Sequence, residues 1–115
     1  MHLSKLEKDV LGDLAQDSHE LWEIYEFVRY AHPDKQEDEV ISDGRKLLGA
    51  WIGRGWLKAR RSRTDGNVLS GDELLAVVDR LGPQAADPKE GIILLELTDQ
   101  ATKDVDWLQA KEAKI

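Results

Sequence analysis

The chain has 115 residues, a net charge of −7 and no cysteine, which together predict one acidic domain with a single hydrophobic core. The lack of cysteine excludes disulfide bridges, thiolate metal sites and a cysteine nucleophile. A sequence pI near 4.9 disfavours non-specific binding to nucleic acid, so such binding would need a local cluster of basic residues. No apolar stretch reaches the length of a signal peptide or a membrane span, so we expect a soluble, cytoplasmic protein without membrane contact.

Two amphipathic helices are predicted in the first 32 residues. The first covers residues 3–15, where leucine and valine recur at helical intervals among charged residues. The second follows an N-cap at Asp17 or Ser18 and has a wide apolar arc, so we expect it to be the most buried helix. It ends at His32, because Pro33 pushes the residue before it out of the α region.

A third helix is predicted over about residues 38–53, with Gly55 as a left-handed stop after it. Its apolar residues fall on one face at helical spacing. The opposite face holds Ser42, Lys46, Gly49 and Gly53. Two acidic residues, Glu39 and Asp43, flank that polar face near the beginning of the helix.

The second half of the chain predicts two strands and two further helices. Residues 56–63 and 92–98 are the strands, and the second of them is the most β-like run in the chain. Between the strands, a short amphipathic helix lies between Ser70 and Gly82. A last helix is capped by Thr98 or by the residue after it.

The predicted fold class is mainly α (α+β), with three helices before the strands. The run K-L-L-G-A-W-I-G-R-G-W-L at residues 46–57 resembles the third helix of a winged helix-turn-helix protein, leading through an R-G-W-L turn into the first wing strand. The run L-E-L-T-D-Q-A at residues 95–101 is similar to the second wing strand and the start of the closing helix, where such proteins read L-T-x-x-G or L-T-x-x-A. The resemblance covers about residues 3–64 and 92–108.

This resemblance implies a single winged-helix domain over residues 1–110, with three helices, a two-stranded β-wing, an inserted short helix and a C-terminal helix. Residues 65–91 form an insertion much longer than an ordinary wing tip, and residues 111–115 form a flexible tail. In winged-helix regulators a terminal helix often dimerises. We therefore expect a homodimer with Trp107 at its interface.

Residues 44–64 form a basic block, with seven Lys or Arg side chains and no acidic one. The winged-helix resemblance implies that the third helix enters the major groove of duplex DNA and that the wing contacts the backbone. The leading hypothesis is therefore a transcription regulator that binds double-stranded DNA. Its phosphate contacts would come from Arg45, Lys46, Arg54, Lys58, Arg60, Arg61 and Arg63, with Ser42 as the candidate base reader.

Three alternatives to DNA binding stay open, the third being a structural subunit of a larger assembly. In the first, the basic side chains pair with the protein's own carboxylates or form a solvated face. In the second, the chain is an acidic protein-interaction winged helix, such as an immunity protein, antitoxin or adaptor, that binds a basic partner without DNA. The interface would then be the insertion at residues 65–91 or an acidic stripe of Glu20, Glu23 and Glu26.

The remaining candidate groups predict core packing rather than chemistry. Four tryptophans occupy four different predicted elements, and we expect Trp22 and Trp51 in the core and Trp56 as a wedge between the third helix and the wing. The three histidines are scattered and form no metal-binding motif. No nucleophile–base pattern or phosphate-binding glycine motif is present, so we expect a protein that is not an enzyme and needs no cofactor or metal.

Overall fold

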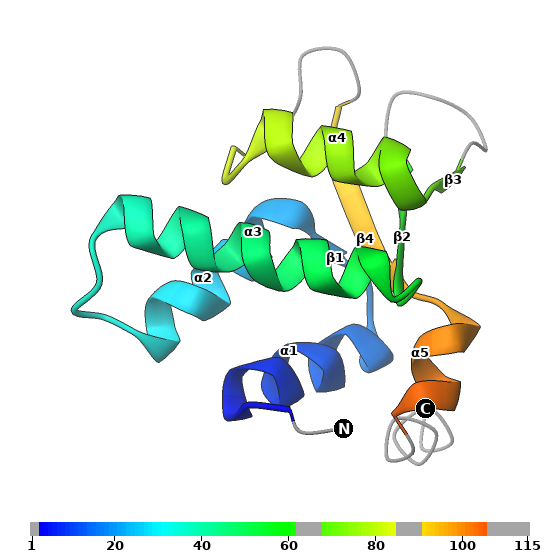
Figure 1. The fold of residues 1–115 in the computed structure, drawn as a ribbon, viewed down its shortest axis with the longest axis horizontal. Coiled ribbons are helices and arrows are strands. Elements are labelled where there is room, and N and C mark those ends of the chain that lie inside the picture. The colour runs from blue at the N-terminus through cyan, green and yellow to red at the C-terminus, as the bar shows by residue number, and fades with distance from the viewer. Residues whose placement is uncertain (1–2, 62–67, 85–90, 106–115) are drawn as a thin grey trace.

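The computed structural model describes residues 3–61, 68–84 and 91–105, which form a mainly helical α+β domain (Figure 1). This confirms the predicted fold class at that level. The first half contains α1 (Lys5–Gln16), β1 (His19–Glu20), α2 (Leu21–Ala31) and α3 (Glu37–Gly53). The second half contains β2 (Leu57–Arg61), β3 (Val68–Leu69), α4 (Gly71–Leu81), β4 (Ile93–Leu97) and α5 (Asp99–Asp104).

The strands form one antiparallel sheet in the order β1-β4-β2-β3. The central pair is β2 with β4, in a register that runs from Leu57 opposite Leu97 to Arg61 opposite Ile93. Strand β1 pairs with β4 on its other side, through His19 opposite Leu95. The sequence did not predict β1, because two residues are too few to show a strand alternation.

Local capping fixes where the helices begin. Helix α1 starts with a capping box, in which the backbone N–H of Glu7 donates to Ser4 Oγ and the N–H of Ser4 donates to Glu7 Oε1. Helix α2 begins later than predicted, with Glu20 rather than Asp17 or Ser18 at its N-cap. The expected cap was wrong because the residues just before the helix pair with β4 as β1.

The turn from α3 into β2 depends on a glycine. Gly55 has a φ of 74°, a conformation that favours glycine, which confirms it as the left-handed stop after α3. The N–H of Trp56 donates to the carbonyl of Trp51 at 2.9 Å, and the N–H of Gly55 donates to that of Ile52 at 3.0 Å. The end of β4 is fastened to the same turn, because the N–H of Thr98 donates to the carbonyl of Trp56 at 2.9 Å.

The core lies between the helices and one face of the sheet. Trp51 and Trp56 are fully buried, with ring centroids 6.3 Å apart, so both predictions of burial are confirmed. Trp22 is only partly buried, and its Nε1 donates to Glu20 Oε2 at 2.8 Å. The prediction that Trp22 belongs to the core was wrong, because the core already fills the other face of α2.

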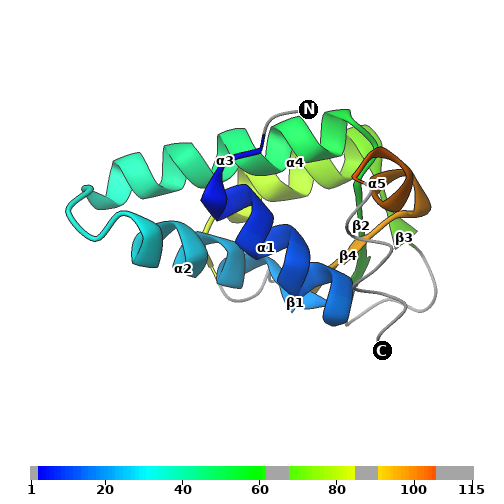
Figure 2. The ribbon, with the colours of Figure 1, turned by 90° about the horizontal axis from the view of Figure 1, so that it is seen from below.

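Helix α4 packs alongside α3, on the side of α3 opposite to α1 (Figures 1 and 2). Its buried residues Leu74, Val77, Val78 and Leu81 join the main core. The part of the predicted insertion that the structure describes is thus an integral layer of the domain. Within the described residues, no helix is both long enough and apolar enough to span a membrane.

Candidate interaction surfaces

The basic block divides between α3 and β2, and on α3 its residues take different directions. Ser42 and Lys46 are exposed, as predicted for the polar face of this helix. Arg45 instead turns toward α4, where its Nη2 donates to the carbonyl oxygen of Asp79 at 3.0 Å. Gly49 is half-buried, because Leu75 of α4 covers that side of α3. Helix α4 therefore narrows the surface that α3 exposes to solvent.

Two arginines of β2 have acidic neighbours within the same chain. Arg60 Nε lies 2.6 Å from Glu96 Oε1 on β4. Arg61 Nη2 lies 3.7 Å from Glu73 Oε2 on α4. Lys58 is partly buried and stands directly opposite Glu96 in the sheet register. Ion pairs at the surface contribute only about 0–1 kcal/mol each, but these carboxylates offset the positive charge that a phosphate would meet. The Arg61 side chain is itself only 16% exposed, so little of it is open to a phosphate.

Arg54 and Trp56 form a stacked pair at the end of α3, with the guanidinium carbon 4.9 Å from the ring centroid.

Two other predicted site residues, Arg63 and Trp107, lie outside the described residues. The tail at residues 111–115 also lies outside them. The described residues of the basic block therefore lie on the side of α3 that faces α4, on the exposed face of α3 and on the sheet. DNA binding stays a prediction.

The three glutamates of the acidic stripe on α2 each contact a neighbouring group of the same chain. Glu20 caps the helix, and its side chain accepts from the indole of Trp22. Glu23 accepts at Oε1 from the N–H of Glu20 at 3.2 Å, and its Oε2 lies 2.8 Å from Nδ1 of His19. Glu26 accepts from Arg29. These contacts hold all three carboxylates in place on the outer side of α2.

Glu23 and Glu26 line a hollow of about 240 Å³ on the outer face of α2. The other lining residues are all aromatic: Trp22, Phe27 and Tyr30. Tyr30 is 83% exposed, the most exposed large apolar side chain in the described part of the chain. The sequence predicted a wide apolar arc on this helix but did not single out Tyr30. The width of that arc is the sequence feature that could have indicated exposed aromatic side chains, because one helix face cannot bury so many large residues.

Tyr30 and Phe27 also border a larger groove of about 810 Å³ between α1 and the end of α2. This groove carries both signs of charge. Its remaining lining residues are Ser4, Lys5, Leu6, Lys8, Asp9, Asp13, Ala31 and His32. The hollow and the groove are neighbours, because the same tyrosine and phenylalanine line both.

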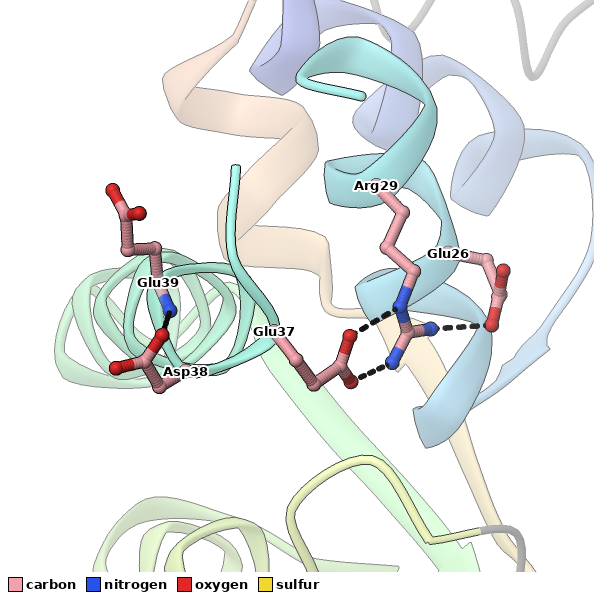
Figure 3. A network of polar contacts seen from close by, with 5 residues as sticks. All are labelled: Glu26, Arg29, Glu37, Asp38 and Glu39. Atoms are coloured by element: carbon pink, nitrogen blue, oxygen red, sulfur yellow. Dashed lines mark hydrogen bonds and ion pairs between the residues drawn. The ribbon is translucent and has the colours of Figure 1, made fainter. Parts of the chain in front are cut away.

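The turn between α2 and α3 protrudes at one end of the molecule, and an arginine network holds it together (Figures 1 and 3). Arg29 donates to both carboxylate oxygens of Glu37 and to Glu26 Oε1. The hydrogen bond from Arg29 lowers the pKa of the Glu37 carboxyl below its usual range. Asp38 and Glu39 point away from Arg29, so the first turn of α3 presents an acidic surface.

A second ion pair spans the same turn. Lys35 Nζ lies 2.6 Å from Asp43 Oδ2, and this hydrogen bond lowers the pKa of the Asp43 carboxyl. Across residues 3–61, 68–84 and 91–105, no three His, Cys, Asp or Glu side chains are arranged to hold a metal ion. Comparison of the chain with protein-family models, curated proteins and solved structures gives no significant match.

Proposed function

We propose that this chain is a variant winged-helix domain that works as a protein-interaction module and binds a basic partner protein through the outer face of α2. Its biological role would be that of an immunity protein, antitoxin or adaptor. The fold proposal is supported by the order of elements, since three helices precede the antiparallel pair β2 and β4. It is also supported by Thr98 and Trp56, which come from the two resembling motifs and hydrogen-bond to each other through their backbones.

The observation that carries the proposed function is the aromatic and acidic hollow on α2. Aromatic side chains are enriched at protein interfaces, where they contribute a large contact area at a low cost in side-chain entropy. Tyr30 is 83% exposed, and the hollow beside it is lined by two carboxylates in a protein of net charge −7. A partner of positive charge would be attracted to this face and would cover its rings.

Pull-down experiments that use the full chain as bait test this proposal. We expect a basic protein of the source cell to be retained by the wild type and lost with Tyr30→Ala. The matched control is Val68→Ser, since Val68 is also an exposed apolar residue, 50% exposed, but lies on β3. The proposal is wrong if no captured protein depends on Tyr30, or if Val68→Ser abolishes capture equally.

Binding to duplex DNA, with a role in transcription regulation as a cytoplasmic homodimer, is the second candidate function. The exposed Ser42 and Lys46 on α3, together with the 66% exposed side chain of Arg60, favour it. Fluorescence anisotropy with a random duplex at low and moderate ionic strength tests it. Lys46→Ala and Arg60→Ala should each weaken binding and reduce the log–log salt slope by about 0.9. No binding at low ionic strength would remove this candidate.

A further inference from the structure

We infer that the hollow on the outer face of α2 is a receptor for an arginine side chain of the basic partner. This inference rests on the proposed function and names the chemical group that the surface recognises. The hollow of about 240 Å³ lies below the range of about 300–1,000 Å³ that is usual for small-molecule pockets. Its size therefore suits one long side chain better than a metabolite.

The lining of the hollow selects a cation. Three aromatic rings, from Trp22, Phe27 and Tyr30, line the hollow, and the face of an aromatic ring attracts a positive charge. Among the described residues of the lining, the charged side chains are the carboxylates of Glu23 and Glu26. An anionic or neutral group would gain less from this lining, because it would desolvate the carboxylates without offsetting their charge.

The carboxylates are already positioned, which lowers the entropy cost of binding. Glu23 is held by His19 and by the N–H of Glu20 as part of the α2 capping box. Glu26 is held through one oxygen, Oε1, by Arg29, whose other nitrogens engage Glu37 (Figure 3). A guest that meets side chains already fixed in place loses less of its binding energy to ordering them.

Arginine fits this lining better than lysine. A guanidinium is planar, stacks on aromatic rings and has several N–H donors in a fixed fork, whereas an ammonium is a compact, strongly hydrated charge. The chain itself contains such a contact, since the Arg54 guanidinium lies 4.9 Å from the Trp56 ring centroid. Trp22, Glu26 and Tyr30 recur at every fourth residue of α2, so they line one stripe along which the side chain can lie.

The neighbouring groove accounts for the rest of the partner segment. Phe27 and Tyr30 line both the hollow and the groove between α1 and α2. A segment that placed its arginine in the hollow would cross Tyr30 and continue into the groove. Lysine and aspartate side chains both line the groove, so it can accommodate a partner segment that contains acidic and basic residues. The preference for a cation comes from the hollow.

Nuclear magnetic resonance titration of the ¹⁵N-labelled full chain tests the inference directly. Three peptides of the same Gly/Ser-rich sequence carry one central arginine, lysine or citrulline, which is a neutral isostere of arginine. With the arginine peptide we expect the indole N–H signal of Trp22 and the amide signals of residues 22–30 to move. The citrulline peptide should bind about tenfold more weakly, and the lysine peptide should fall between the two.

Variants of the chain complete the experiment. Tyr30→Ala should weaken binding of the arginine peptide, and the distant Val68→Ser should leave it unchanged. Equal affinity for the arginine and citrulline peptides, shifts confined to α3 and β2, or no shifts at all would each overturn the inference. The two proposals fail separately. A partner captured through Tyr30 without any preference for arginine over citrulline retains the proposed function and removes only the arginine receptor.

Discussion

Replacement of Gly44 by alanine should destabilise the domain, although alanine is the better helix former. Gly44 lies in the interior of α3 and is buried against Tyr25 of α2. A Cβ atom at this position would lie 2.6 Å from both Cδ1 and Cε1 of the tyrosine ring. Carbon atoms in contact prefer separations of about 3.5–4.0 Å, so about 1 Å of space is missing.

The size of the effect follows from two opposing terms. The tyrosine ring cannot move away easily, since Tyr25 is fully buried in the main core. Overpacking costs about 1–3 kcal/mol, and a buried ring only 2.6 Å away places the cost in the upper part of that range, at about 2–3 kcal/mol, whereas the higher helix propensity of alanine returns about 1 kcal/mol. We expect Gly44→Ala to lower the free energy of unfolding by about 1–2 kcal/mol. The melting temperature should fall by about 4–8 °C for a domain of this size.

Urea denaturation followed by circular dichroism measures this change, with Gly49→Ala as the matched control on the same helix. A Cβ at Gly49 would lie 3.9 Å from Leu75 Cδ1, an ordinary contact. Gly49→Ala should therefore stabilise the domain by about 0.5–1 kcal/mol. The reasoning is refuted if Gly44→Ala matches or exceeds the stability of the wild type, or if both alanines shift stability in the same direction.

Three further predictions concern single polar groups. Tyr25→Phe should change stability by less than about 1 kcal/mol in urea denaturation, because the buried hydroxyl, although it lies near the Arg45 guanidinium, makes no hydrogen bond of ordinary geometry within the described structure. Asp104→Ala should cost about 1–2 kcal/mol in the same assay, because it leaves the Trp56 Nε1 donor, now 2.8 Å from Asp104 Oδ2, without its acceptor. Glu37→Gln should be less stable than the wild type at neutral pH. Arg29 lowers the pKa of Glu37, so its stabilisation is present above the ordinary carboxyl pKa of about 4.3, and the difference should vanish as the pH falls through the lowered pKa of Glu37.

Much of the helical structure was predictable, because its determinants are local. Apolar periodicity located α1, α3 and α4, and the glycine stop at Gly55 was found from sequence alone. Thr98 was correctly identified as a candidate cap of α5, where its side chain accepts from the N–H of Ala101. Each of these signals lies within a few residues of the feature that it controls.

The environment of the candidate sites was not predictable in the same way, because it depends on long-range pairing. Arg60 meets Glu96 from β4, and Arg45 meets a carbonyl of α4, in each case more than thirty residues away along the chain. From the sequence, such internal pairing was only one alternative interpretation of the basic block. The register of β2 against β4 and the packing of α4 on α3 decide these contacts.

The sequence by itself determined the helices, the principal strands, the acidic net charge and the clustering of basic residues at positions 44–64. These follow from composition and from interactions between near neighbours. Only the tertiary structure decided which side chains face solvent. It directed one side of α2 into the core and left Trp22, Phe27 and Tyr30 around an acidic hollow on the other. Helical periodicity shows which side of a helix is apolar. How much of that side is buried depends on the elements that pack against the helix.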